Sequence, residues 1–106
     1  MPSIVMIYTT FSNRHDAETL GEDLVNRGYA ACVNITPTHT SIYRWEGQVQ
    51  RQEEVAMIVK TSRNRVDEVM LEVHRLHPYD VPAITIWEAQ AHPSFVSFVD
   101  EHTKEF

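Results

Sequence analysis

The sequence has little cysteine and little glycine, and it contains no long hydrophobic run or basic cluster. Its 106 residues include a single cysteine, Cys32, which cannot close a disulfide within the chain and fits a reducing compartment. The three glycines are scattered, whereas enzymes that hold a phosphoryl group with backbone N–H groups use glycine-rich loops. No Ser/His/Asp or paired-carboxylate arrangement can be read from the spacing either. We therefore expect no catalytic activity.

Basic residues are few and dispersed. Nine Lys and Arg residues face fifteen Asp and Glu residues, for a formal net charge of −6. Phosphate backbones attract clustered Lys and Arg, so we expect no nucleic-acid ligand. Apolar runs fall short of the roughly 18 residues that a membrane span needs, and Met1-Pro2-Ser3 leads into a strand-like segment without a charged leader. We expect a cytoplasmic protein without membrane attachment, folded as one domain over residues 1–106.

The first part of the chain predicts a strand and a helix. Ser3–Thr10 is apolar and β-branched without polar alternation, which is typical of a strand covered on both faces. A helix over Arg14–Arg27 follows, capped by Ser12 or Asn13 and stopped by Gly28. Its apolar positions at helical spacing are Ala17, Leu20, Gly21, Leu24 and Val25.

The next part predicts two strands joined by a turn. Ala31–Ile35 begins the first of them, Pro37 interrupts it with a bulge or edge, and Ser41–Trp45 resumes the extended pattern. Alternation over Val55–Lys60 predicts the partner strand. The acidic pair Glu53-Glu54 just before it is interpreted as a solvated edge.

These two strands are too long for the rest of the protein. An extended stretch from Ala31 to Gly47 reaches about 50 Å, whereas the preceding helix covers only about 20 Å. The hairpin turns at Trp45-Glu46-Gly47-Gln48, so its tip cannot lie over its own core. An exposed overhang that carries Ile42, Tyr43 and Trp45 is an aggregation hazard unless another subunit covers it. The hairpin is therefore predicted to serve assembly.

The last part predicts a helix, a strand and a terminal helix. The middle helix is capped by Ser62 or Asn64 and ended by Pro78, and Ala83–Glu88 forms the strand after it. Its apolar stripe is Val66, Val69, Met70, Val73 and Leu76. Pro93 suits the first turn of the terminal helix, and Phe95, Phe98 and Val99 are expected to dock it on the body.

The predicted order is strand, helix, strand, strand, helix, strand, with a terminal helix after it. Right-handed crossovers then place both main helices on one face of an antiparallel sheet. This is an α+β, ferredoxin-like (βαββαβ) fold with a long hairpin between its second and third strands. Because this fold hosts many functions, the site has to indicate which one applies.

Three segments together resemble the CutA family of divalent-cation tolerance proteins: Ala30–Ile35, Thr40–Gly47 and His77–Pro82. The resemblance runs nearly from end to end. It implies a ferredoxin-like subunit in a tight homotrimer, in which the long hairpins pair with strands of neighbouring subunits. It also implies a link to copper tolerance and copper binding without an established catalytic activity. The fold and assembly resemble those of the PII signalling proteins as well, which implies a sensing or adaptor role.

The resemblance carries over only part of a copper site. The best-described bacterial copper site in the family uses a cysteine near the end of the first strand and two adjacent histidines just before the Pro-Tyr pair. This chain has Tyr8, Leu76 and His77 at those positions, so only His77 matches. Cys32 is either a small buried hydrophobe or a soft ligand for copper or another divalent cation such as zinc. His77 is either a metal ligand or an imidazole that holds the turn after it.

Four further residues are candidates for a ligand-binding cleft. Tyr43 and Trp45 project from one strand face and are either packing residues or a platform for a small molecule. Tyr79 lies in a stiff turn between two prolines. Glu46 lies at the hairpin turn and could pair with Arg44 of the same strand or of another subunit. The leading hypothesis is a trimer that binds a metal ion or small ligand in a cleft between subunits. The alternative is a metal-independent adaptor of the PII type that captures a protein partner.

Overall fold

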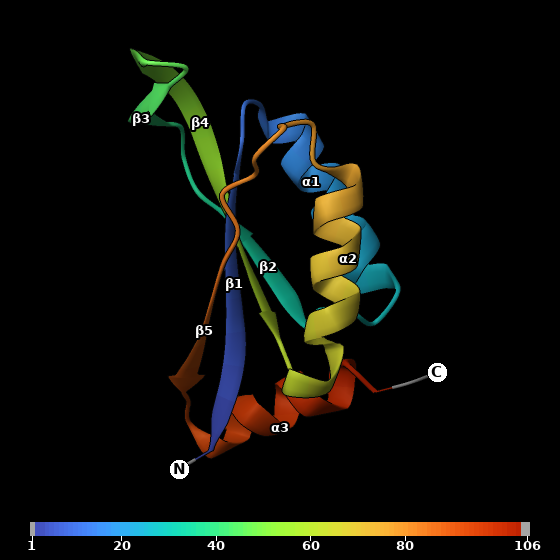
Figure 1. Ribbon diagram of the computed structural model, residues 1–106. Helices are drawn as coiled ribbons and strands as arrows, with labels where there is room; N and C mark the ends of the chain where they lie inside the picture. Colours follow the sequence, from blue (N-terminus) through green and yellow to red (C-terminus); the bar gives the residue numbers. More distant parts are fainter. Residues whose placement is uncertain (1, 105–106) are drawn as a thin grey trace.

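The computed structural model describes residues 2–104 and shows an α+β protein built on an antiparallel sheet (Figure 1). The predicted order of strands and helices is confirmed, and the second strand is divided at Pro37 as expected. In chain order, the elements are β1 (Ser3–Phe11), α1 (Arg14–Asn26), β2 (Cys32–Ile35), β3 (His39–Trp45), β4 (Gln48–Thr61), the short 3-10 helix η1 (Arg63–Arg65), α2 (Val66–Leu76), β5 (Thr85–Gln90) and α3 (Pro93–His102).

Strand β4 connects the parts of the sheet. The strand order is β2-β4-β1-β5, and β3 pairs with the first half of β4 beyond this body. β4 has 14 residues and is longer than the predicted strand at Val55–Lys60, because the hairpin arm continues into the body without a break. The acidic residues at its centre were expected to be solvated, and this is wrong for Glu54, which is only 6% exposed.

The main core lies between the sheet and the helices α1 and α2, which share one face of it (Figure 1). Alternation along β1 and β4 points every second side chain at these helices. Val25 was predicted to join the helix stripe, but it is 41% exposed because it lies beyond the face that packs. Gly21 allows α1 to approach β2, since a Cβ at this position would lie 3.1 Å from Val33 Cγ1. The buried strand and helix residues of this core include Val5, Ile7, Phe11, Leu20, Leu24, Val55, Met57, Val59, Val69 and Val73.

The helix ends show which capping predictions hold. Asn13 caps α1, because its Oδ1 accepts a hydrogen bond of 2.9 Å from the Asp16 N–H. The cap predicted for α2 at Ser62 or Asn64 is wrong, since η1 intervenes and Arg65 occupies the N-cap position. The hydroxyl groups of Ser62 and Thr103 are instead hydrogen-bonded to each other at 2.8 Å, so Ser62 helps to hold the end of α3.

The C-terminal elements agree with the sequence in outline. β5 begins two residues later than predicted, at Thr85, where pairing with Tyr8 starts. α3 begins at Pro93 as predicted, and it crosses one end of the sheet face that α1 and α2 leave open (Figure 1). Val99 is fully buried there, whereas Phe98 is 42% exposed, so the prediction that Phe98 docks on the body is wrong.

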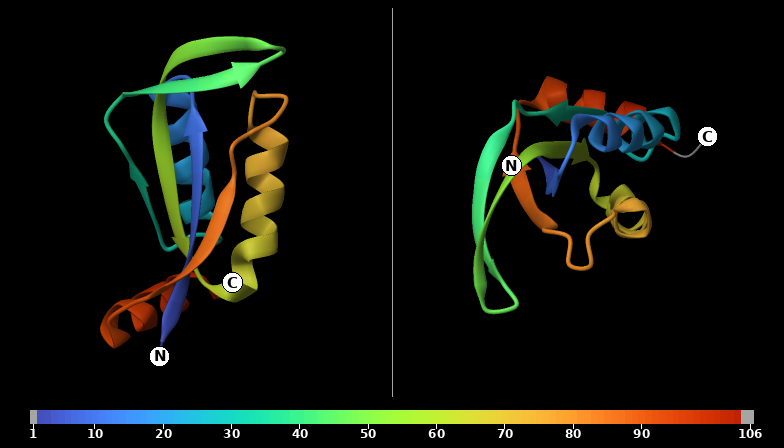
Figure 2. Two further views of the ribbon diagram at one scale, coloured as in Figure 1. Left: turned by 60° about the vertical axis from the view of Figure 1, so that its left-hand side comes forward. Right: turned by 90° about the horizontal axis from the view of Figure 1, so that it is seen from above.

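The β3–β4 hairpin extends beyond the body of the molecule, as predicted (Figure 2). The radius of gyration is 14.5 Å, whereas a compact chain of this length would have about 13 Å. At the tip, Glu46 and Gly47 have φ angles of +51° and +78°, which are typical of a type I′ turn. Ile42 and Val49 are about 60% exposed on its arms. The hairpin therefore carries apolar surface that its own chain does not cover.

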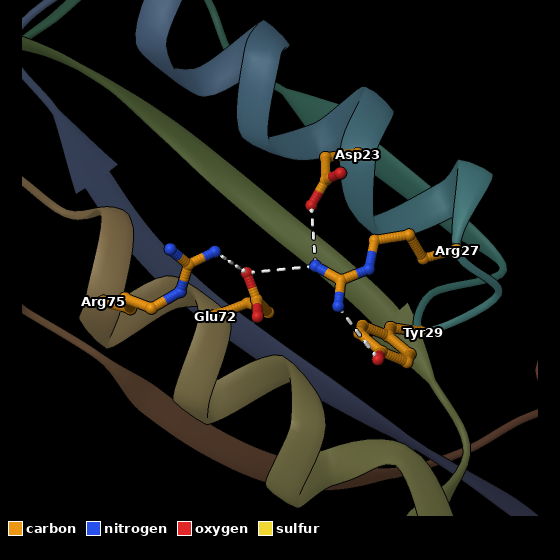
Figure 3. A network of polar contacts seen from close by, with 5 residues as sticks. All are labelled: Asp23, Arg27, Tyr29, Glu72 and Arg75. Carbon is orange, nitrogen blue, oxygen red and sulfur yellow. Dashed lines mark hydrogen bonds and ion pairs between the residues drawn. The ribbon is translucent and has the colours of Figure 1, made fainter.

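A network of ion pairs joins α1 to α2 (Figure 3). The carboxylate of Glu72 lies 3.2 Å from Arg27 Nη1 and 2.8 Å from Arg75 Nη2. Arg27 also contacts Asp23, and its Nη2 donates to the hydroxyl of Tyr29 at 3.1 Å. The hydrogen bond from Arg75, followed by the charges of both arginines, lowers the pKa of Glu72 against the opposing effect of burial.

We expect the free energy of unfolding of the Glu72→Gln variant to fall less between neutral and acidic pH than that of the wild type. A carboxyl group whose pKa is lowered by folding stabilises the protein above its unfolded-state pKa, and this contribution is lost as the pH falls through the folded-state pKa. Urea denaturation near neutral pH and at about pH 3 should therefore give a smaller difference in free energy of unfolding for Glu72→Gln than for the wild type. Glu18→Gln, on the exposed side of α1, is the control and should keep the wild-type difference. Equal differences in all three proteins would contradict the prediction.

Candidate functional site

The candidate site forms where the chain leaves α2, beside the base of the hairpin. His77 follows the last residue of α2 and has an extended backbone (φ −75°, ψ 132°), as predicted from the proline after it. Its side chain is 8% exposed and stacks on Phe11, with ring centroids 4.5 Å apart. The ring of Tyr79 contacts it edge-on at 4.6 Å. His77 is thus held between the core and the turn that follows.

Both ring nitrogens of His77 take part in hydrogen bonds within the chain. Nε2 lies 2.6 Å from the carbonyl oxygen of Thr10, which can only accept, so Nε2 carries the hydrogen. Nδ1 accepts a hydrogen bond of 3.2 Å from the backbone N–H of Tyr79. This geometry matches the interpretation in which the imidazole holds the following turn. As a metal ligand, His77 would first have to give up one of these bonds.

The structure separates the two residues predicted as metal ligands. Cys32 is half-buried and lies opposite Lys60 of β4, and Lys60 lies opposite Met6 of β1 on its other side. Alternation places these side chains on the sheet face opposite α1 and α2, whereas His77 packs on Phe11, a residue of the core beneath those helices. The two residues therefore do not form a metal site within one chain. Among residues 2–104, no group of three or more His, Cys, Asp or Glu side chains is arranged to hold a metal ion.

A chain of hydrogen bonds connects Tyr79 with the hairpin. The Tyr43 hydroxyl donates to Gln52 Oε1 at 2.8 Å, and Gln52 Nε2 donates to the Tyr79 hydroxyl at 3.1 Å. The Tyr79 hydroxyl in turn donates to Glu54 Oε2 at 2.8 Å. These bonds join β3, β4 and the turn between Pro78 and Pro82, so they fix the direction in which the hairpin leaves the body.

The environment of Tyr79 keeps its phenol protonated. Burial, followed by the hydrogen bond to Glu54 and the charge of that carboxylate, raises the pKa of Tyr79 to about 12. A protonated phenol is a donor, which the carboxylate of Glu54 requires in a site where it is almost fully buried. The arrangement suits positioning and binding.

The four cleft candidates fall into two groups. Tyr43 and Tyr79 lie at the base of the hairpin and are linked through Gln52. Trp45 and Glu46 lie at its tip, where the Trp45 side chain is 42% exposed. Within this chain Arg44 does not pair with Glu46 but donates to the carbonyl of Gly47 at 3.3 Å, and a pair between subunits stays a prediction. The cleft candidates at the tip therefore do not join those at the base of the hairpin within residues 2–104.

Gln52 and Glu54 were not predicted as site residues. Both project from the same face of β4, and they lie opposite Ser41 and His39 in register. The sequence contains a signal for these residues: Gln52 and Glu54 are two positions apart, so their side chains lie on one face of β4, the face that Tyr43 shares on β3. It could not be used without the register of β3 against β4, which the turn at Glu46 and Gly47 sets.

Comparison with known proteins identifies the family. A family model described as CutA1 divalent ion tolerance protein matches residues 5–102. The chain belongs to the CutA1 family. It is 36% identical to the divalent-cation tolerance protein CutA of Thermus thermophilus over 104 residues, covering 97% of this chain and 99% of that protein. It is also 40% identical to the chloroplastic protein CutA of Arabidopsis thaliana over 84 residues, which cover 79% of this chain and 46% of that longer protein.

Solved CutA structures share the fold. The CutA1 structure from Ehrlichia chaffeensis superposes with a TM-score of 0.91 at 32% identity, covering 98% of each chain. A structure called the periplasmic divalent cation tolerance protein CutA, from Archaeoglobus fulgidus, gives a TM-score of 0.90 at 33% identity, covering 96% of this chain and 99% of that one. These CutA proteins are named for tolerance of divalent cations and not for a reaction. Within residues 2–104, no helix has the length and apolar character needed to cross a membrane.

We expect Tyr79→Phe to destabilise the protein and to change its alkaline behaviour. Removing the hydroxyl leaves the buried Glu54 carboxylate without its donor, which costs about 1–3 kcal/mol. Because folding raises the pKa of Tyr79 from 10 to about 12, its contribution is complete below pH 10 and is lost as the pH rises towards 12. Denaturant unfolding against pH should therefore show a smaller loss of stability across this interval in the variant.

Tyr43→Phe is the matched control for that experiment. It also removes one hydroxyl, but the side chain is 41% exposed and its bond is to the neutral amide of Gln52. Its effect should be about 1 kcal/mol or less. A loss for Tyr79→Phe no larger than that for Tyr43→Phe would show that Glu54 does not depend on the phenol.

Proposed function

We propose that this chain is a trimeric, cytoplasmic protein of the divalent-cation (copper) tolerance type, which binds a metal ion or small ligand in a cleft between subunits and catalyses no reaction. In this proposal residues 1–106 form a single ferredoxin-like domain, and the assembly resembles that of PII proteins. The main support for this proposal is the projecting hairpin, whose exposed apolar residues would be buried by contact with a neighbouring subunit. Those residues are Ile42, Tyr43, Trp45 and Val49.

The open sheet face supports the same assembly. α3 covers one end of the face opposite α1 and α2, while Tyr8 and Ile58 are half-buried and Trp87 is 41% exposed on it. Paired strands that leave large apolar side chains on one face usually bury them against another layer. Subunits joined through this face and the hairpins would bury both surfaces.

The hydrogen bonds around Tyr79 support a cleft at the hairpin base. They hold the hairpin against the turn between Pro78 and Pro82, so a Trp45 side chain from one subunit would meet a prearranged surface on the next. Since Cys32 and His77 lie on opposite sides of one sheet, any metal site that uses both would take them from different subunits. Its thiolate and imidazole would suit copper or zinc.

The metal-independent alternative has its own support. Both ring nitrogens of His77 already have partners within the chain, and Leu76 beside it is a 46% exposed leucine that cannot bind a metal ion. An adaptor of the PII type would use the exposed hairpin to present a surface to another protein. The two alternatives differ in whether metal binding depends on His77 and Cys32.

Assembly is tested by changing the hairpin. Ile42→Ser combined with Val49→Ser should lower the trimer fraction in light scattering and remove the concentration dependence of the melting temperature. Leu71→Ser is the control, because Leu71 is 66% exposed on α2 and lies outside the hairpin and the open sheet face. A wild-type protein that is monomeric at all concentrations would refute the assembly.

Metal binding is tested by competitive titration of the demetallated protein with Cu(I), Cu(II) and Zn(II). We expect submicromolar binding of one metal that Cys32→Ala or His77→Gln weakens by about tenfold or more. His102→Ala, on the exposed end of α3, is the control and should bind as the wild type does. Binding weaker than micromolar, or unchanged in both site variants, would favour the adaptor.

A further inference from the structure

A groove separates α1 from β2 at the β2 edge of the sheet. Its volume is about 610 Å³. β2 is the last strand in the sheet order, so within residues 2–104 no strand pairs with its outer edge. The groove thus combines a helix wall, an apolar floor and an open strand edge.

Within residues 2–104, the backbone groups of β2 on this edge have no strand partner. The Thr36 N–H donates to the Ala56 carbonyl at 2.9 Å, and these two residues continue the register that pairs Asn34 with Ile58. In an antiparallel ladder the residues alternate between those that bond to the partner and those that point away. The N–H and C=O groups of Val33 and Ile35 therefore point away from β4, towards the position that a further strand would occupy.

The floor of the groove is apolar. The side chains of Val33 and Ile35 face α1 and are half-buried, and the exposed Val25 adds to them from the helix. Gly21 allows the helix to lie close to this floor, because a Cβ at this position would be only 3.1 Å from Val33 Cγ1. Apolar side chains of a further strand could therefore pack on this floor.

The helix wall of the groove is acidic. Glu18 and Glu22 are exposed, lie one turn apart on α1 and both line the groove. Neither forms an ion pair with a basic side chain of residues 2–104. Two like charges at this spacing repel each other, so a basic group between them would be favourable.

We propose that this groove binds an extended segment of a partner protein, which adds to the outer edge of β2 as an antiparallel strand. Apolar residues of the segment pack on Val33 and Ile35, and basic residues at either side of them pair with Glu18 and Glu22. The backbone bonds supply affinity, and the alternating side chains supply specificity. This surface is separate from the proposed cleft at Tyr79 and does not depend on metal binding.

The test uses a fluorescein-labelled, capped peptide, Lys-Thr-Val-Thr-Val-Thr-Lys, and measures its fluorescence anisotropy with the wild-type protein. Paired antiparallel with β2, its two valines lie opposite Val33 and Ile35 and point their N–H groups at the edge. We expect saturable binding at micromolar concentration. The same peptide N-methylated on both valines should bind about tenfold more weakly or worse. This comparison uses only the wild-type protein and so does not depend on the folding of a variant.

Charge reversal tests the acidic wall. Glu22→Lys should weaken binding by about fivefold or more, whereas Asp67→Lys, an equal change of charge on the exposed face of α2, should stay within about twofold of the wild type. No saturable binding, equal binding of the N-methylated peptide, or equal effects of the two charge reversals would each overturn the proposal. So would a fall in oligomer mass on peptide addition, which would make the groove a contact between copies. Metal titration and assembly have separate readouts, so failure of the cleft proposal would be distinguishable from failure of this one.

Discussion

The structure depends on the uninterrupted pairing of β4. This strand pairs with β1 and β2 in the body and with β3 in the hairpin, so one register fixes both parts. From Val55 onwards every second side chain enters the core, and before it the same alternation builds the hairpin face with Gln52 and Glu54. A slip of one residue would exchange the two faces over the full length of the strand, exposing the core residues and burying Lys60.

The base of the hairpin is held by polar contacts because the apolar core ends there. Phe11 and Val55 are the last core residues of β1 and β4 on this side among residues 2–104, and the hairpin beside them is supported by Tyr79, Gln52 and Glu54. Each of these bonds is partly shielded from water, which strengthens it and penalises its loss. The hairpin can therefore leave the body in one direction while the residues at its tip stay exposed.

The fold was largely predictable from the sequence, and the site was predictable only in part. Local signals placed the strand at Ser3–Thr10, the Asn13 cap and the terminal helix at Pro93, because each depends on neighbours in the chain. Glu54 was misread as solvated, since its partner Tyr79 is 25 residues away. The prediction that Ser62 caps α2 was wrong for a similar reason, because its hydroxyl is hydrogen-bonded to Thr103, which is distant in the sequence. His77 was recognised as a residue that could hold a turn, but its stacking on Phe11 could not be anticipated.

The sequence by itself determined the order of the elements, the break at Pro37, the long hairpin and membership of the CutA1 family, because these follow from local patterns and from segments that can be compared directly. The tertiary structure decided which side chains meet. It placed Cys32 and His77 on opposite sides of the sheet, joined Tyr43 to Glu54 through Gln52 and Tyr79, and left the edge of β2 open beside Glu18 and Glu22. Contacts of this kind depend on strand register and on helix placement, and both are set by packing across the whole chain.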